Sequence, residues 1–439
     1  MFDDLQASLD DFDIHNRMGA LQKLVALNPD TLAVKAGQYV NMHCHTFFSY
    51  NAYGYSPSRF AWLARSRGLA AAQIVDFDVL DGLDEFIEAG RLLELKVAVG
   101  METRVFVPEF ADKEMTSPGE PGITYHMGVG FVSCDLKKGQ KSFLNMLRST
   151  AQRRNIELVS RVNQYLRPVV LDYERDVVPL TPSGNATERH ICLAYVKKAV
   201  EVFNSSDDLA RFWSEKLSVE SDELDLPDGP RLQGIIRTKT MKQGGVGYVQ
   251  PDTGSFPRMA QTNEFILAAG AIPALTWLSG FSQGEKAIER LLDVAMDSGV
   301  AAINIIPDRN FTPGIKDEKL ANLYHIVNIA QSRNLPVVVG TEMNSPGQKF
   351  VDDFDSEELA PLLPVFLKGA YIVYGHSVMQ RRCGLGYISR WAQSRFSCSA
   401  EKNSFFEEIG AVLEPKAEHL LDGLDETATP NQILKKIRR

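Results

Sequence analysis

The chain has 439 residues, 44% of them hydrophobic, so it is long enough for one large α/β domain with an insertion or for two domains. Its formal net charge of −9 disfavours nucleic acid or an anionic membrane as the main partner, because both select for basic surfaces. The five widely spaced cysteines favour reduced thiols in the cytoplasm over a disulfide framework. We expect no membrane span, and the acidic amino terminus predicts no secretory signal.

The first predicted strand carries two histidines one residue apart, His43 and His45. Side chains alternate between the two faces of a strand, so both imidazoles are expected on the same face. This arrangement is typical of a pair of metal ligands, but two structural histidines are an equal alternative. The rest of the chain has to decide between these interpretations.

Strands and helices alternate along the chain after this pair. Apolar runs predict further strands at residues 69–75, 96–99, 123–132, 271–277, 301–306 and 335–339. Strands that alternate with helices predict a parallel sheet. Seven such strands predict an α/β fold of the distorted (β/α)7 TIM-like barrel type, and an open doubly wound sheet is the alternative architecture.

Polar residues stand at or just beyond the ends of these predicted strands. They are His43, His45, Asp76, Glu102, Asp308 and Glu342. Because the carboxyl ends of barrel strands converge on one mouth, we expect these side chains to meet there. A further apolar run at 370–373 precedes His376 and resembles another strand end, although a surface or helix-capping histidine is the alternative.

The alternation stops between residues 134 and 258, where the sequence predicts helices and loops. We interpret 134–258 as a mainly helical insertion. The barrel is then expected in two parts, 38–133 and 259–400, flanked by helical segments at 1–37 and 401–439.

The insertion also contains candidate substrate-binding residues. Arg237 and Lys239 precede a glycine-rich stretch at 243–247, and such cations near exposed backbone N–H groups suit a phosphate or carboxylate. A surface loop with solvated lysines is the alternative interpretation. Arg189 and His190 lie in the predicted first turn of a helix, where they could contact a substrate as well as cap the helix.

Four ordered motifs resemble those of the polymerase and histidinol phosphatase (PHP) family of metal-dependent phosphoesterases. They lie at residues 43–46, 74–83, 100–102 and 125–128. The resemblance spans roughly residues 38–132 and 258–345. It implies a distorted seven-stranded β/α barrel, up to three metal ions held by histidines and carboxylates, and the hydrolysis of phosphate esters.

The chain departs from the family pattern at several ligand positions. Tyr50, Phe77, Trp277 and Asn344 occupy slots where the family usually offers a metal ligand. The resemblance therefore implies a reduced centre of one or two divalent ions. Its candidate ligands are His43, His45, Glu102, His126 and Glu342. Imidazole and carboxylate ligands suit zinc, manganese or iron.

Most of these candidates have a structural alternative. Glu102 could pair with an arginine, Glu342 could be an exposed loop residue, and His126 could be a core histidine bonded to the backbone. Asp76 is expected to orient a ligand histidine rather than to bind the metal itself.

The sequence thus predicts a metal-dependent hydrolase, with a phosphoesterase acting on a small anionic substrate as the leading hypothesis. A metal-activated water would attack, Arg309 would neutralise a phosphate, and Asp308 or His376 would transfer protons. Two alternatives stay open: a catalytically inactive binding or regulatory module, and a metal-dependent hydrolase of a non-phosphate substrate. Neither the substrate nor the oligomeric state follows from the sequence.

Overall fold

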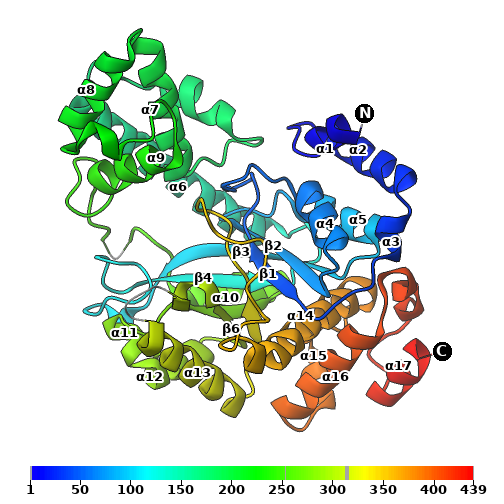
Figure 1. The fold of residues 1–439 in the computed structure, drawn as a ribbon. Helices are drawn as coiled ribbons and strands as arrows, with labels where there is room; N and C mark the ends of the chain where they lie inside the picture. Colours follow the sequence, from blue (N-terminus) through cyan, green and yellow to red (C-terminus); the bar gives the residue numbers. More distant parts are fainter. Residues whose placement is uncertain (1, 253, 312–315, 439) are drawn as a thin grey trace. The chain divides into compact units, whose positions relative to one another are not determined.

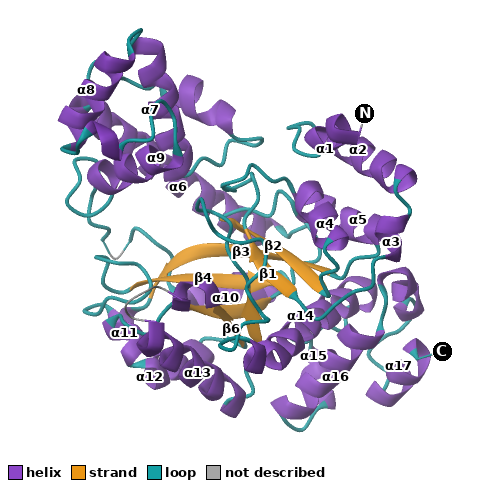
Figure 2. Cartoon of the chain, in the orientation of Figure 1, coloured by secondary structure: helices purple, strands orange, loops and turns teal. Residues whose placement is uncertain are grey.

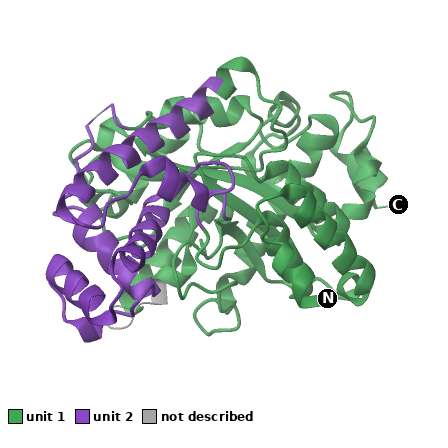
Figure 3. Ribbon diagram, turned by 90° about the horizontal axis from the view of Figure 1, so that it is seen from above, with its two compact units in different colours: residues 1–46, 51–141, 256–439 green, residues 47–50, 142–255 purple. Residues whose placement is uncertain are grey.

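The computed structural model describes residues 2–252, 254–311 and 316–438. The chain divides into two compact units, the first of which comprises 1–46, 51–141 and 256–439 (green in Figure 3). The second unit comprises 142–255 together with the short segment 47–50 (purple in Figure 3). The predicted insertion, 134–258, contains the whole of 142–255, whereas no feature of the sequence predicted that residues 47–50 belong to the same unit.

The first unit contains a sheet of seven strands that follow each other in chain order. The strands are β1 (Val40–Cys44), β2 (Ala71–Phe77), β3 (Val97–Phe106), β4 (Ile123–Val129), β5 (Ile272–Trp277), β6 (Ala302–Ile305) and β7 (Val337–Val339) (Figures 1 and 2). The sheet closes where the chain beyond β7 meets β1. There the Glu342 N–H donates to the His43 carbonyl at 2.7 Å, and the His45 N–H donates to the Glu342 carbonyl at 2.8 Å. The predicted distorted barrel is therefore confirmed.

One strand runs against the others. β4 pairs antiparallel with both β3 and β5, whereas the remaining pairs are parallel. The expectation of a wholly parallel sheet was wrong at this point, because the link from β3 to β4 holds only the 3-10 helix η1 (Pro108–Phe110) and no crossover helix. The carboxyl end of β4 consequently lies at the opposite end of the sheet from those of its neighbours.

Helices accompany the barrel strands as the alternating pattern predicts. They are α4 (Pro57–Ser66), α5 (Leu83–Leu93), α10 (Met259–Ala268), α11 (Gln283–Lys286), α12 (Ile288–Asp297), α13 (Lys316–Ser332) and α14 (Leu363–Cys383). The start of α4 follows the sequence signal, since the Ser56 side chain accepts the Arg59 N–H and Pro57 occupies the first turn. The amino-terminal helices are α1 (Phe2–Ser8), α2 (Ile14–Leu27) and α3 (Asp30–Ala33), and the carboxyl-terminal ones are α15 (Arg390–Arg395), α16 (Ser399–Val412) and α17 (Pro430–Ile437).

Helix α14 corrects two expectations. Residues 370–373, which resemble a strand in the sequence, lie in the middle of this 21-residue helix. The segment Ala360–Cys383 is also long and apolar enough to cross a membrane, although the sequence analysis expected no such stretch. Its apolar window is 72% buried inside the structure, where α14 packs on β7 and on α16, so burial explains its composition as that of a core helix.

The second unit has a helical core of its own. Its main helices are α6 (Lys138–Tyr165), α7 (Glu188–Val202), α8 (Ser206–Leu217) and α9 (Pro230–Ile236). The longest of them, α6, is one continuous helix of 28 residues. Buried apolar side chains from all four helices form the core, including Val162, Tyr195, Trp213 and Ile236.

Candidate metal centre

Three predicted ligands meet inside the barrel. β1 carries His43 and His45, β3 carries Glu102, and each of these side chains is at most 2% exposed. The two imidazole Nε2 atoms are 3.3 Å apart. The Oε2 atom of Glu102 lies 3.3 Å from Nε2 of His45 and 3.8 Å from Nε2 of His43. Among the described residues, these three form a group whose ligand atoms all lie within 4.8 Å of one another.

The spacing of these atoms fits one metal ion. For metal–ligand bonds of about 2.0–2.2 Å, neighbouring ligands of a tetrahedral ion are separated by about 3.3–3.6 Å. Two of the observed distances, both 3.3 Å, match this separation, and the third, 3.8 Å, is slightly longer. Two imidazoles and one carboxylate are also a ligand set that zinc and similar divalent ions accept, with further coordination positions left open.

Burial sets the charge of the three side chains. Burial raises the pKa of Glu102 to about 7, against the opposing effect of the neighbouring His43. Burial also lowers the pKa of His43 and of His45, so both imidazoles are neutral at neutral pH. Neutral imidazole is the form that binds a metal, and a divalent ion would favour the carboxylate form of Glu102.

Glu342 borders this cluster but has a cation of its own. Its carboxylate accepts hydrogen bonds from Arg309 Nη2 at 2.8 and 3.1 Å and from Gln348 Nε2 at 3.0 Å. Burial alone would raise the pKa of Glu342, but Arg309 and His43 outweigh it and the pKa is lowered. The predicted role of Glu342 as a metal ligand stays a prediction, because its carboxylate is engaged with Arg309 here.

Backbone geometry also marks Glu342 as an unusual residue. Its φ is 61°, and that of Met343 is 55°, so two successive non-glycine residues occupy the left-handed region. The Glu342 peptide closes the barrel against β1 on both sides of its own Cα, which holds this strained conformation in place. The predicted loop glutamate is therefore a buried residue at the seam of the barrel, 5% exposed.

Asp76 and Phe77 flank the pair of histidines. Asp76 accepts from the N–H and from the hydroxyl of Thr46, at 2.8 and 2.7 Å, and its charge raises the pKa of His45 against the effect of burial. Phe77 stacks on the His45 ring, with centroids 4.5 Å apart. The slot where the PHP family usually has a histidine is thus filled by a ring that packs on a candidate ligand.

His126 is not part of the cluster. In the antiparallel pair of β3 and β4 it lies opposite Thr103, whereas Glu102 lies opposite Met127, so His126 and Glu102 point to opposite faces of the sheet. Its Nε2 atom lies 2.6 Å from Oδ1 of Asn263 on α10. The expectation of a ligand at His126 came from the resemblance of residues 125–128 to a motif of the PHP family, and the structure places this buried histidine against Asn263 on α10.

Trp277 also lies away from the cluster. It pairs in register with Ile305, and both belong to the apolar core, whereas the preceding residue Thr276 pairs with Asn304. Asn304 contacts His43, so the inward side of β5 at this level is occupied by Thr276. Another replaced slot, Asn344, is half-buried in the loop that follows the barrel seam.

The predicted proton-transfer residues have different surroundings. His376 lies inside α14, where its Nε2 contacts the Gly130 carbonyl at 3.2 Å and its Nδ1 accepts the Tyr387 N–H at 2.9 Å. Both ring nitrogens are thus engaged within the packing of α14, so the expected strand-end position was wrong. Asp308 is partly exposed beside Arg309 and lies 3.9 Å from Lys349 Nζ, and its catalytic role stays a prediction.

The predicted substrate-binding residues all belong to the second unit. Glu188 forms ion pairs with Arg237 at 2.8 Å and with Lys242 at 2.7 Å, so one carboxylate offsets both of these cations. His190 is buried, and its Nδ1 accepts the Thr187 N–H at 3.1 Å, which is the helix-capping role. The ring of Tyr50 packs edge-on against His190, with centroids 5.1 Å apart. Arg189 is half-buried, and burial lowers its pKa.

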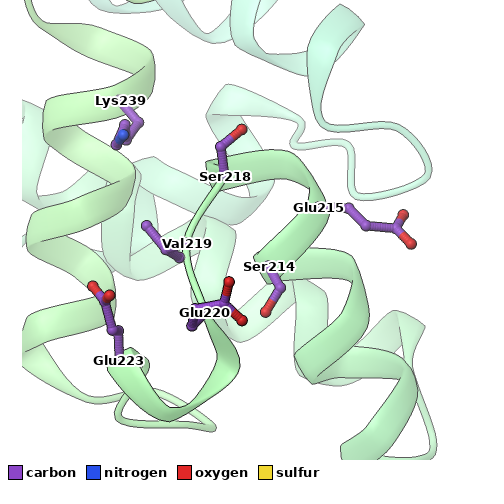
Figure 4. Close-up of a pocket in the computed structure, with 7 residues that line it drawn as sticks. All are labelled: Ser214, Glu215, Ser218, Val219, Glu220, Glu223 and Lys239. Carbon is purple, nitrogen blue, oxygen red and sulfur yellow. The ribbon is translucent and has the colours of Figure 1, made fainter.

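Lys239 lines a pocket of the second unit (Figure 4). The other lining residues are Ser214, Glu215, Ser218, Val219, Glu220 and Glu223. Three glutamates around one lysine give this pocket an acidic surface. Such a surface repels an anionic ligand, so the pocket does not support the prediction that Lys239 binds a phosphate.

Two polar residues at this site were not predicted from the sequence, one that contacts the cluster and one that contacts Glu342. Asn304 lies on β6, 3.1 Å from His43, and Gln348 lies in the loop after the seam, 3.0 Å from Glu342. Asn304 had a signal in the sequence, because it is an amide inside the apolar run Ala302–Ile306. A polar side chain in a buried strand needs a hydrogen-bond partner, and the partner of Asn304 is the candidate ligand His43.

Comparisons with known proteins identify the fold. No protein-family model and no curated protein matches the chain. An amidohydrolase from Chromobacterium violaceum, solved with bound sulfate and no metal, is similar with a TM-score of 0.50 and 15% identity over 75% of this chain and 96% of that chain. A protein from Bifidobacterium adolescentis, proposed to be a metal-dependent phosphoesterase, gives a TM-score of 0.49 and 16% identity over 74% and 96%. At such identities the likeness concerns the fold alone.

Proposed function

We propose that this chain is a metal-dependent hydrolase whose active site is the cluster of His43, His45 and Glu102. The observation that carries the proposal is the spacing of the three ligand atoms, 3.3, 3.3 and 3.8 Å, on side chains that are at most 2% exposed. Two neutral imidazole nitrogens held this close without a shared proton or a cation would repel each other through their lone pairs. A divalent ion removes this repulsion and explains why the side chains converge.

When bound, the ion would polarise a substrate oxygen and lower the pKa of a coordinated water to about 7. The chain itself supplies the remaining functions. Phe77 packs on His45 and holds its ring, while Asp76 fixes Thr46 next to it. Glu342 holds Arg309, whose side chain is 43% exposed and thus accessible to an anionic group of a substrate.

The preferred substrate in this proposal is a small phosphate ester. The support is the position of Arg309, whose charge acts on both Glu342 and Glu102, together with the resemblance of the ordered motifs to the PHP family. A guanidinium beside a metal centre is suited to the charge that develops on a phosphoryl group.

The presence of free cysteines at all five positions agrees with our further proposal of a cytoplasmic location.

Metal analysis and a phosphatase assay on the same preparations test the proposal. Protein purified without added metal or chelator should contain about one divalent ion per chain and should release phosphate from p-nitrophenyl phosphate. The His43→Ala variant should lose both properties, whereas His15→Ala, which removes an exposed imidazole on α2, should lose neither.

Each other outcome points to one of the alternatives. Bound metal that depends on His43 but supports no phosphatase activity would favour a hydrolase of a non-phosphate substrate. A folded protein that binds no divalent ion would favour the inactive binding or regulatory module, and would contradict the proposal.

A further inference from the structure

Asn304 connects a candidate ligand to the neighbouring strand. Its side chain is fully buried in β6, with Oδ1 3.1 Å from Nδ1 of His43 and Nδ2 3.2 Å from the carbonyl oxygen of Val338 on β7. His43 is also fully buried. The amide thus makes one contact on each side within the interior of the barrel.

The contact with Val338 decides which way the amide faces. A backbone carbonyl can only accept a hydrogen bond, so the atom of Asn304 that faces it must be the amide nitrogen. The opposite orientation would bring two oxygens together in a buried site at 3.2 Å, which is unfavourable. The amide oxygen therefore faces His43.

This orientation in turn decides which nitrogen of His43 carries the proton. An amide oxygen only accepts, so Nδ1 of His43 must be the donor. A neutral imidazole has one N–H, so Nε2 then carries the lone pair. Nε2 is the atom that faces Nε2 of His45 and Oε2 of Glu102.

We infer that Asn304 is a positioning residue that holds His43 in the Nδ1–H tautomer and so prepares its Nε2 to bind a divalent ion. The inference rests on the proposed metal centre but not on hydrolytic activity. A partner that fixes the second nitrogen of a ligand histidine sets the orientation of the ring and the affinity of the site. Loss of such a partner typically lowers metal affinity by about 10–100-fold.

The neighbouring Thr276 offers a matched control. It pairs in register with Asn304, and its hydroxyl is also buried but has no hydrogen-bond partner. Thr276→Val therefore removes a polar group at the same level of the barrel without removing a hydrogen bond to His43. If Asn304 served only to fill space, its replacement and that of Thr276 would have similar effects on the metal site.

Nitrogen NMR of the metal-free protein tests the tautomer directly. With histidine labelled at both ring nitrogens, His43 is identified by the signals that vanish in His43→Gln. The inference predicts a protonated Nδ1 and an unprotonated Nε2 in the wild type and in Thr276→Val. A wild-type His43 with the proton on Nε2 would overturn it, and this measurement needs no folded Asn304 variant.

Metal affinity, measured by competition with a chelator that reports zinc, provides the second test. Asn304→Leu should bind zinc about 10–100-fold more weakly and show a mixture of His43 tautomers. Asn304→Asp keeps an acceptor for Nδ1–H but places an oxygen against the Val338 carbonyl, so it should retain the tautomer and bind zinc more tightly than Asn304→Leu, although more weakly than the wild type. Equal weakening in the Leu and Asp variants would mean that the bond to Val338 matters, and would overturn the inference.

These readouts separate this inference from the proposed function. If the wild type binds zinc and the variants behave as stated but no substrate is hydrolysed, the inference stands and the hydrolase proposal fails. If hydrolysis is observed but Asn304→Leu binds zinc as tightly as Thr276→Val, the inference fails and the hydrolase proposal stands.

Discussion

Two regions of the first unit hold buried histidines, and they use them differently. At the barrel mouth, His43 and His45 direct their Nε2 atoms at each other and at Glu102. Where helices pack on the barrel, the rings of His126 and His376 contact Asn263 and the backbone of Gly130 and Tyr387. All four are fully buried, so burial does not distinguish them. What distinguishes a candidate ligand is a ring nitrogen that faces other ligand atoms. Nδ1 of His126 has no hydrogen-bond partner either, but His126 does not belong to the group of described residues whose ligand atoms converge.

The largest expected difference between the two regions concerns metal binding. His45→Ala removes one of three ligands and should lower zinc affinity by more than about 100-fold, beyond the loss typical of outer contacts. His126→Ala removes an equally buried imidazole on the other face and should leave the metal content unchanged. Elemental analysis of both proteins, checked for folding by circular dichroism, measures this. Equal loss of metal in both variants would contradict the distinction between the histidines at the barrel mouth and those that pack against helices.

The region where helices pack on the barrel should instead contribute most to the free energy of unfolding. A Cβ atom added at Gly369 on α14 would lie 1.8 Å from the carbonyl oxygen of Val337 on β7, so the helix could not keep its position. Gly369→Ala should therefore lower the free energy of unfolding by about 3 kcal/mol or more. Gly19→Ala, where nothing lies within 4 Å of the added atom, should be neutral or stabilising by up to about 1 kcal/mol. Urea unfolding compares them, and equal effects would contradict the packing described here.

Acid should weaken the packed region through its histidines. Burial lowers the pKa of His126 and of His376 from 6.5 to about 4, so the folded protein binds these protons less well than the unfolded chain does. Their contribution to the free energy of unfolding is complete above about pH 6.5. It is lost as the pH falls towards 4, by up to about 3 kcal/mol for each histidine.

Urea unfolding of the wild type and of His376→Gln at several pH values between about 7 and 4 follows this loss. The variant should show the smaller decrease in unfolding free energy. A wild type whose unfolding free energy does not change over this range would contradict the account of these histidines.

The smallest expected effect lies within the mouth itself. If the proposed substrate is correct, Arg309→Gln removes the cation that would bind its anionic group and should raise KM for a phosphate ester about tenfold or more, with a smaller change in kcat. Arg290→Gln, which removes an arginine on α12, is a matched control. Steady-state kinetics with p-nitrophenyl phosphate measures both. An unchanged KM in Arg309→Gln would show that Arg309 does not contribute to substrate binding.

Much of this architecture could be predicted because strand ends carry local signals. His43, His45 and Glu102 follow apolar runs, and the periodic alternation of strands and helices predicts a barrel. The direction of β4 has no such local signal, since it depends on the length and content of the link from β3. The antiparallel direction of β4 was therefore not predicted.

Other features depend on contacts that are distant in sequence. Residues 370–373 form an apolar run that suits a strand or a buried helix, and only packing on β7 and α16 decides for the helix. The ion pair of Arg309 with Glu342 joins residues 33 positions apart, and Asn304 meets His43 across 261 positions. Composition and periodicity do not encode such pairs.

Anomalous diffraction from crystals grown with zinc tests the central claim most directly. We predict a single strong peak about 2.0–2.2 Å from Nε2 of His43, Nε2 of His45 and a carboxylate oxygen of Glu102. Well-ordered crystals at saturating zinc that show no peak among these three side chains would contradict the metal centre and the hydrolase proposed from it.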